Sequence, residues 1–402
     1  MTWLAAHRAW LLGLAVSIAF WPGMLSPAFG PRWAVLAIGL PLALAIDPRE
    51  LPETIRWLLA FFLAIAAASI FVSPDRLTAY YEMMQIVIVA GVSVAAAGLD
   101  DSDKAMDGVA VGLMVSVMIA LFGLSTAGDQ GRGGDVIPTG LFLNSEVFAE
   151  FAALVFVWAA ARMRPIAAAA ALVPIALCNS RIAIATALIG VLYAYWPKSI
   201  AKGVALAACI GMVMVVMVFA LGSYKIGTAD HRIVIWGTAV LAFWHDPFGR
   251  GLGWFQAALP DEMFAHSDAL QMLTELGVGA VAIIIIPIAA LRKGRGTNAE
   301  RALFVAVCFQ SVVSFPLHMP ASAFVAALVA GRLVGRRALV RVGEHVSRDV
   351  DDADQRRQAA SDREYPVRSG RGGGAVSVRS GAENTAAVYP RSHRVDPEPR
   401  GA

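Results

Sequence analysis

The chain has 402 residues, of which 58% are hydrophobic and only 16% are charged, and its formal net charge is +3. Soluble domains average roughly 45–50% apolar and about 25% charged residues, so this composition excludes an ordinary soluble protein. Only α-helices and closed β-barrels satisfy all their backbone hydrogen bonds in lipid, and strand-like alternation is absent. We therefore predict an all-α, polytopic integral membrane protein. The net charge is too small to indicate a class of partner, and we expect no nucleic acid among the partners.

Windows of about 20 residues predict about twelve membrane-spanning helices before residue 341. They cover residues 10–29, 33–46, 55–72, 80–98, 106–124, 147–161, 166–177, 182–196, 204–222, 269–291, 302–315 and 321–340. No internal repeat is evident in the sequence, which weakens the case for a transporter built from inverted halves.

Basic residues on alternate connections set the predicted orientation, because Lys and Arg are enriched in cytoplasmic loops. The residues concerned are Arg8, Arg49, Arg56, Arg162, Arg164, Lys198, Lys202, Arg292, Lys293, Arg295 and Arg301. Both termini then lie in the cytoplasm. The opposite side receives a glycine-rich loop at 125–143, a short turn at 179–181, a long loop at 223–266 and a turn at 315–320.

The composition changes after the last predicted span. Residues 341–402 are rich in Arg, Asp, Gly and Ser and nearly free of large aliphatic side chains. Such a segment buries too little apolar surface to offset the entropy lost on ordering, so we predict a disordered cytoplasmic tail. Residues 1–340 then form the membrane domain. Four arginines at the junction are interpreted as a positive anchor on the cytoplasmic side, namely Arg332, Arg336, Arg337 and Arg341.

Two arginines on the predicted outer side are candidate anion-binding residues. Arg181 begins a span where the orientation bias disfavours arginine, so its side chain either extends to lipid head groups or holds an anion. Arg232 begins a segment, 232–244, in which apolar residues recur at helical spacing. This segment is predicted to form an amphipathic helix along the outer interface. Sealing the bundle is the alternative role for that helix.

A histidine in the long loop is a candidate base. Ser267 or Asp268 is predicted to cap a helix that enters the membrane, which places His266 at the outer mouth of the bundle. A neutral imidazole accepts a proton near pH 7, as a general base must. An ordinary interfacial histidine is the alternative. His318, in the turn FPLHMP, is the competing base, although its place between prolines is more typical of a structural residue.

Further polar groups on this side are candidates for binding a substrate. Glu146 and Glu150 are four residues apart and share a helix face, where they act as a base, bind sugar hydroxyls or hydrogen-bond between helices. Asp268 and Arg250 belong to the same polar stretch, and glycines around Arg250 permit a closely approaching backbone. The three cysteines have no metal-ligand spacing, so we expect neither a metal nor a cofactor.

Taken in chain order, these motifs resemble the O-antigen ligase and bacterial polysaccharide polymerase superfamily. The resemblance is carried by SR at a span start, R-x-x-x-W in the loop helix, HDPFGRGLGWF and HSDALQMLTELGVG. With GLFLNSEVFAE and FPLHMPASAF it covers residues 139–333. Two positions depart from the family pattern: Ser267 stands where Asn usually follows the histidine, and Ser145-Glu146 stands where Pro-Asn is commoner. These departures bear on substrate identity more than on the chemistry.

The resemblance implies a GT-C-like membrane fold with a large periplasmic loop at 223–266, in the inner membrane of a bacterium. It also implies an inverting, metal-independent glycosyltransferase that moves a glycan from undecaprenyl diphosphate to a lipid A-core sugar, another glycan or another periplasmic acceptor. By position, Arg181 and Arg232 match the family's diphosphate-binding arginines, and His266 matches its essential histidine. Two other classes stay open: a lipid-linked glycan flippase or other transporter, and a non-catalytic scaffold of an envelope complex.

Overall fold

The computed structural model describes most of the chain up to residue 335. The described residues are 2–20, 29–44, 46–99, 102–122, 129–130, 136–137, 139–142, 144–178, 180–195, 227–259, 265–282, 285–286, 291 and 296–335. The predicted span at 204–222 and the predicted tail lie outside them. The chain divides into two units, Met1–Ser347 and Arg348–Ala402, and all that follows concerns the first.

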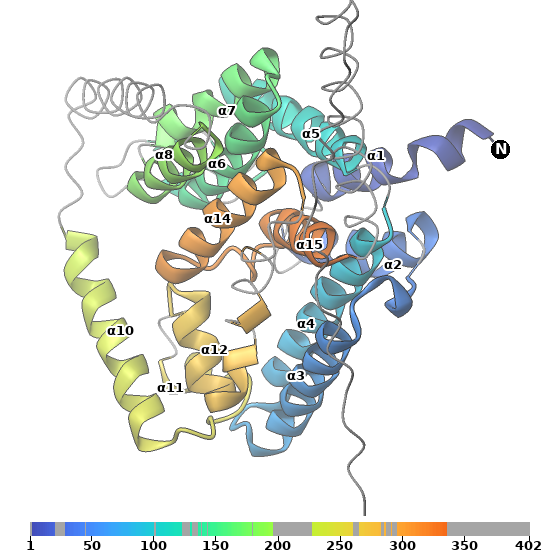
Figure 1. The fold of residues 1–402 in the computed structure, drawn as a ribbon. Coiled ribbons are helices and arrows are strands. Elements are labelled where there is room, and N and C mark those ends of the chain that lie inside the picture. The colour runs from blue at the N-terminus through green and yellow to red at the C-terminus, as the bar shows by residue number, and fades with distance from the viewer. Residues whose placement is uncertain are drawn as a thin grey trace, which may run out of the picture. The chain divides into compact units, whose positions relative to one another are not determined.

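The described part of this unit is helical except for one pair of two-residue strands (Figure 1). The elements are α1 (Thr2–Ile18), α2 (Phe29–Ala43), η1 (Pro48–Glu50), α3 (Glu53–Val72), α4 (Arg76–Ala97), α5 (Asp103–Leu121), β1 (Asp129–Gln130), β2 (Val136–Ile137), α6 (Ser145–Ala161), α7 (Pro165–Cys178), α8 (Arg181–Tyr195), α10 (Gly227–His245), α11 (Trp254–Ala258), α12 (Asp268–Leu276), η2 (Gly277–Ala280), α14 (Asn298–Val313) and α15 (Pro320–Val334). The antiparallel pair β1–β2 lies in the predicted glycine-rich loop, where no strand is predicted.

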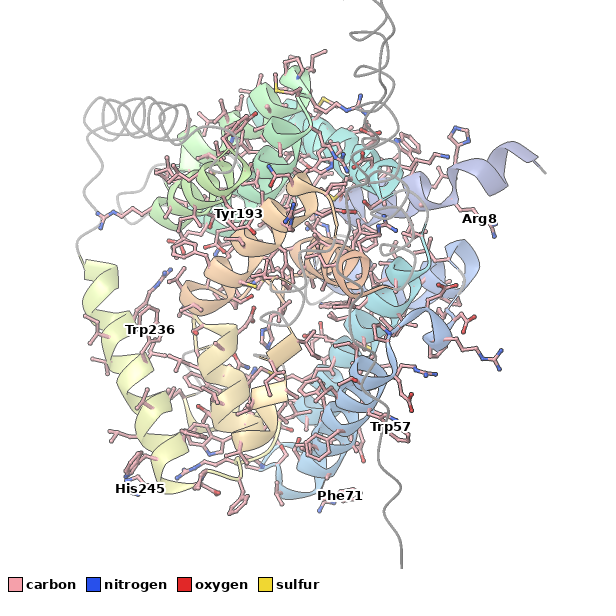
Figure 2. The ribbon with its side chains drawn as sticks, in the orientation of Figure 1. Arg8, Trp57, Phe71, Tyr193, Trp236 and His245 are labelled. Atoms are coloured by element: carbon pink, nitrogen blue, oxygen red, sulfur yellow. The ribbon has the colours of Figure 1, made fainter. Side chains whose placement is uncertain are left out.

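Three described helices, α3, α4 and α5, are long and apolar enough to cross a membrane. Helix α3 also leaves large apolar side chains on its outer face, among them Trp57 and Phe71, which are 69% and 79% exposed (Figure 2). Water disfavours such a face, whereas lipid accommodates it. These helices support a membrane protein. The total of about twelve spans stays a prediction.

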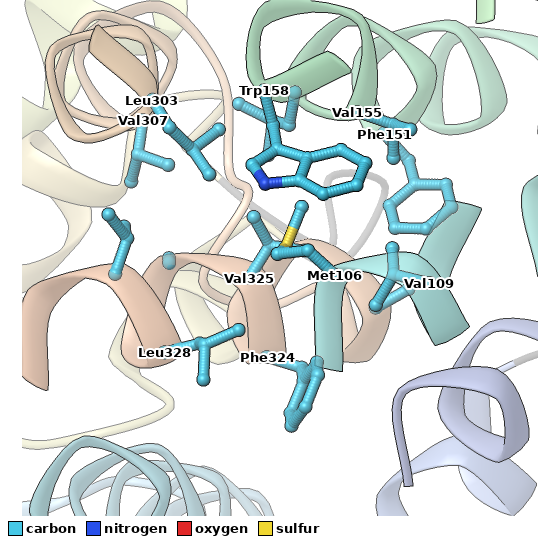
Figure 3. Close-up of a cluster of buried hydrophobic side chains, with 14 of the residues drawn as sticks. Met106, Val109, Phe151, Val155, Trp158, Leu303, Val307, Phe324, Val325 and Leu328 are labelled. Carbon is cyan, nitrogen blue, oxygen red and sulfur yellow. The ribbon is translucent and has the colours of Figure 1, made fainter. Parts of the chain in front are cut away.

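Helices α6 and α15 form the centre of the unit. Nearly all side chains of both are buried, and a helix that is apolar on every side belongs in an interior. Figure 3 shows where they meet their neighbours: Trp158 and Phe151 of α6 lie over Met106 and Val109 of α5, and Phe324 and Leu328 of α15 complete the cluster. This core fixes the position of the helix ends that carry the candidate site.

The predicted span at 269–291 is not one continuous helix. Helix α12 ends at Leu276, and Gly277 has φ +60°, a left-handed value that glycine tolerates best. The end is set by the preceding loop, since the amides of Arg250 and Gly251 donate to the carbonyls of Thr274 and Glu275 at 3.0 and 2.9 Å. The close-approaching backbone predicted from the glycines of this loop is thus confirmed.

Arg332 does not act as a surface anchor, contrary to the interpretation of the sequence. Its side chain is only 6% exposed, and its Nε lies 3.1 Å from a carboxylate oxygen of Glu300. It also donates to the carbonyl of Leu99. The reason is that α14 and α4 bring a carboxylate and a free carbonyl to this helix end, and a buried guanidinium requires such acceptors.

Candidate functional site

The last residue of α14 and the turn that leads to α15, residues 313–319, form the segment where most of the predicted site residues meet. The amide of His318 donates to the carbonyl of Phe315 at 3.1 Å, which closes the turn. Side chains from α6, α10 and α12 reach it. We refer to this segment below as the α14–α15 turn.

Arg232 lies beside this turn and forms an ion pair with Glu146. Its Nη2 is 3.1 Å from Oε2 of Glu146, and its Nη1 donates to the carbonyl of Val313 at 3.5 Å. The Arg232 and Glu146 side chains are 19% and 39% exposed, so both groups remain reachable from solvent. Asn144 caps α6 by accepting from the amide of Glu146, which holds the acid at the first turn of that helix.

One helical turn along α10, Trp236 fixes the segment that carries His266. Its indole Nε1 donates to the carbonyl of Ala265 at 3.1 Å (Trp236 is labelled in Figure 2). Positions four apart share a helix face, so the R-x-x-x-W motif directs Arg232 and Trp236 to the same side of α10. The helix predicted at 232–244 is confirmed and begins earlier, at Gly227.

His266 lies against the α14–α15 turn in an unusual backbone conformation. Its φ is +51°, a value that costs energy for a residue with a side chain. The imidazole packs edge-on against the ring of Phe315, with the ring centroids 5.2 Å apart. The ring contact with Phe315 and the hydrogen bond from Trp236 to the neighbouring Ala265 hold His266 against the turn.

Glu150, four residues after Glu146 in α6, also contacts the α14–α15 turn. The hydroxyl of Ser314 donates to its Oε2 at 2.7 Å, and the Glu150 side chain is buried. The prediction that Glu146 and Glu150 share one face of a helix is confirmed. Of the roles proposed for Glu150, a hydrogen bond between helices is the one that the structure shows.

Asp268 and His318 form a buried pair that the sequence did not reveal. The distance from Oδ1 of Asp268 to Nδ1 of His318 is 2.7 Å, and Oδ2 accepts from the amide of Leu317 at 2.9 Å. Ser267 is the N-cap of α12 and accepts from the amide of Leu270, which confirms the predicted helix start. The carboxylate of Asp268 therefore orients the imidazole of His318, as a carboxylate orients the histidine in catalytic dyads.

The carboxylate controls the protonation of this histidine. Burial lowers the pKa of His318, but the hydrogen bond to Asp268 and the negative charges of Asp268 and Glu82 outweigh burial, and the pKa rises above its ordinary value of 6.5. A raised pKa in the folded state means that the imidazolium stabilises the fold below the unfolded-state pKa. That stabilisation is lost as the pH rises through the folded-state pKa.

The thermal stability of the purified protein should therefore decrease as the pH rises above the ordinary histidine pKa of 6.5 and through the raised pKa of His318. His318→Gln keeps a side chain of similar reach without an ionisable ring, so its melting temperature should vary less over the same range. Melting curves of both proteins in the same detergent test this. Equal pH dependence in both would show that other groups control it.

Arg181 lies at the same end of the bundle as Arg232. Helices α8 and α14 are antiparallel, because Asn298 at the start of α14 donates to the carbonyl of Ala194 near the end of α8. The first residue of α8, Arg181, is thus level with Val313, at the end of α14. Its side chain is exposed.

Arg250 belongs to a different place. It precedes α11, and its guanidinium carbon lies 5.0 Å from the ring centre of Trp254. Its amide bonds to Thr274, two residues before the end of α12, whereas Asp268 begins that helix. The structure therefore separates Arg250 from the α14–α15 turn by most of the length of α12.

A second buried polar cluster joins α4 to α12 and was also not predicted. Glu82 is 3% exposed and accepts from the amide of Gly253 at 2.9 Å and from the side chains of Gln256 and Gln271 at 2.7 and 3.3 Å. Glu275 is fully buried and accepts from Gln271 at 3.4 Å. Glu82 itself could have indicated this cluster from the sequence. A carboxylate within an apolar span is costly, so it usually has a polar partner or a functional role.

No protein-family model matches the chain, and no curated protein matches it either. Among the described residues, no group of three or more His, Cys, Asp or Glu side chains is arranged to hold a metal ion. Function is therefore inferred from the geometry around the α14–α15 turn and from the sequence motifs that form it.

Proposed function

We propose that this protein is a membrane glycosyltransferase of the O-antigen ligase or polysaccharide polymerase type, with about twelve spans in a GT-C-like fold. It transfers a glycan from undecaprenyl diphosphate to a hydroxyl of a periplasmic acceptor, by an inverting and metal-independent reaction. Both termini are cytoplasmic, and the site opens to the periplasm of a bacterial inner membrane. Its products serve lipopolysaccharide or exopolysaccharide biosynthesis.

The observation that carries this proposal is the common location of Arg232, Arg181 and His266 at one end of the bundle. Arg232 and His266 both contact the α14–α15 turn, and the direction of α8 brings Arg181 to the same end. A shared side of the membrane would not by itself bring Arg232 and His266 into contact with residues only two positions apart, Val313 and Phe315. Two arginines and a histidine are the groups that transfer from a diphosphate requires.

The two arginines are suited to binding the diphosphate, which is the leaving group. Guanidinium pairs with phosphate oxygens through two parallel hydrogen bonds and stays charged at any accessible pH. Negative charge grows on the diphosphate as the glycosidic bond breaks, so fixed positive charge lowers the barrier. In the resting site Glu146 neutralises Arg232, and we propose that the diphosphate replaces Glu146 as the partner of Arg232.

His266 is suited to accepting the proton of the acceptor hydroxyl, which is the nucleophile. In the proposed step the acceptor oxygen attacks the anomeric carbon and forms the new bond while the bond from that carbon to the diphosphate oxygen breaks. The acceptor proton passes to the imidazole of His266, and the electron pair leaves with the diphosphate. Attack from the face opposite the leaving group inverts the anomeric centre.

Glycan transfer by the purified protein should survive EDTA without loss of rate. Two arginines supply the positive charge that Mg²⁺ would otherwise bring to the diphosphate. The measurement is transfer in vitro with the metal-stripped protein, with and without added Mg²⁺. Loss of activity on chelation, restored by Mg²⁺, would show that acidic residues such as Asp268 hold a metal.

One observation favours a second function, a transporter of lipid-linked glycans. Glu82 and Glu275 are buried carboxylates on two helices with apolar surroundings, and buried ionisable groups within membrane segments are typical of transport pathways. Both accept hydrogen bonds from neighbouring amides, which is equally the behaviour of structural groups. This alternative gives no role to Arg181, Arg232 and His266.

The glycan profile of a strain that lacks this protein distinguishes these functions. A ligase defect leaves complete chains on the lipid carrier, and a polymerase defect leaves single repeat units. Complementation with the wild-type chain should restore the profile, and Arg232→Ala should not. Accumulation of the carrier-linked glycan on the cytoplasmic side would instead indicate a flippase. An unchanged profile would contradict the proposal.

A further inference from the structure

A cavity of about 460 Å³ lies between α3, α4, α12, α14 and α15. This volume falls within the range of about 300–1,000 Å³ found for ligand sites. Its walls are mostly apolar, and the larger side chains that form them are Phe62, Ile86, Met272, Phe304 and Val307. A space of this size with such walls suits a hydrocarbon chain.

One end of the cavity is polar and rich in hydrogen-bond acceptors. Glu82 and Gln85 of α4 line it together with Asp268 and His318. No lysine or arginine is among the described residues that line the cavity. Asp268 is paired with His318, so Glu82 is the carboxylate that disfavours an anionic head group and favours one that donates hydrogen bonds.

Glu82 already accepts hydrogen bonds from the amide of Gly253 and from the side chains of Gln256 and Gln271. The carboxyl group of Glu275 also lies within hydrogen-bonding reach of Glu82. A ligand hydroxyl or amine at this end would compete with these groups for the carboxylate oxygens of Glu82.

The cavity reaches the apolar surface of the protein. Val312 both lines it and is 56% exposed, and Ile286, another lining residue, follows Ile285, which is 45% exposed. Two of the walls, α3 and α4, are helices long enough to cross a membrane. A lipid chain could therefore enter from the surrounding bilayer without passing through water.

We infer that this cavity binds the chain of a lipid whose head group donates hydrogen bonds and carries no negative charge. The head lies at Glu82 and the Asp268–His318 pair, and the chain lies along α4 and α14. Arg232 and Arg181 do not line the cavity, so this site is distinct from the proposed diphosphate site. The inference depends on the shape and charge of the cavity and not on the proposed glycosyl transfer.

Photocrosslinking of the full chain in lipid nanodiscs tests this inference. Three probes carry the same dodecyl chain with a diazirine and differ in the head: maltoside, ammonium or phosphate. Peptides that contain Phe62, Ile86 or Met272 should be labelled by the maltoside or the ammonium probe. Labelling by the phosphate probe should be at least about tenfold weaker, because like charges repel across the site. The first two probes distinguish a hydroxyl head from an amine head.

Two variants separate the cavity from the outer surface of the helices. Ala90 lines the cavity, so Ala90→Leu should reduce labelling of these peptides several-fold. Ala64, on α3, is exposed and does not line the cavity, so Ala64→Leu should leave labelling unchanged. The inference fails if the phosphate probe labels these peptides as strongly as the others, or if labelling is confined to the exposed face of α3. Neither outcome depends on whether the protein transfers glycans.

Discussion

Arg232→Lys should lower the rate of glycan transfer by on the order of 100-fold, the effect of removing a well-placed donor from a site where charge develops. Lysine keeps the positive charge but loses the planar fork, and so cannot pair with two phosphate oxygens at once. Lysine also has a single nitrogen, whereas two guanidinium nitrogens of Arg232 now bond to Glu146 and to the carbonyl of Val313. We therefore expect the lysine to lose one of these two partners. The measurement is transfer in vitro by the purified variant.

Arg76→Lys is the matched control for this experiment. Arg76 is an exposed arginine at the first residue of another helix, α4, so the exchange tests the loss of a guanidinium away from the site. Its transfer rate should equal that of the wild type. Arg181→Ala should reduce transfer as Arg232→Lys does, and the double variant should lose less than the product of the two effects, because both arginines hold one diphosphate. Wild-type turnover by a folded Arg232→Lys protein would exclude the diphosphate-binding role.

The sequence predicted the helices well because apolar runs report directly on burial in lipid or in a core. Helix α6 and helix α8 begin within two residues of the predicted spans, and Ser267 caps α12 as its side chain allows. The break at Gly277 was not predicted, because it depends on a loop that donates to the last carbonyls of α12. Hydropathy averaged over a window as long as a membrane span does not detect such a break, so it predicts one continuous span.

The candidate site was predicted only in part for a related reason. Arg232, Glu146 and His266 stand out because polar groups are rare beside apolar spans. The partners of Asp268 could not be predicted, since His318 lies 50 positions further along the chain. Glu82 and Gln271 are separated by 189 positions, and no periodicity within one helix indicates such a pair. Contacts between distant segments require the packing of α4, α12 and α14 to be known.

His266→Ala should lower the rate of glycan transfer about 10²–10⁴-fold and should leave binding of undecaprenyl diphosphate unchanged. The arginines hold the diphosphate, whereas His266 is assigned to the acceptor hydroxyl. In the wild type kcat/KM should fall at acidic pH as the imidazole protonates, and the residual activity of the variant should lack this limb. Equilibrium binding of the donor and the pH profile are the two measurements.

His245→Ala and His318→Gln complete this test. His245 is exposed at the end of α10 (Figure 2), so its removal should change neither transfer nor donor binding. His318 is buried against Asp268, so its replacement should lower the melting temperature first, and the protein that remains folded should keep the acidic limb of the pH profile. If His318→Gln removes that limb while His266→Ala retains it, the Asp268–His318 pair is the base. The cavity that Asp268 and His318 line would then adjoin the reacting hydroxyl.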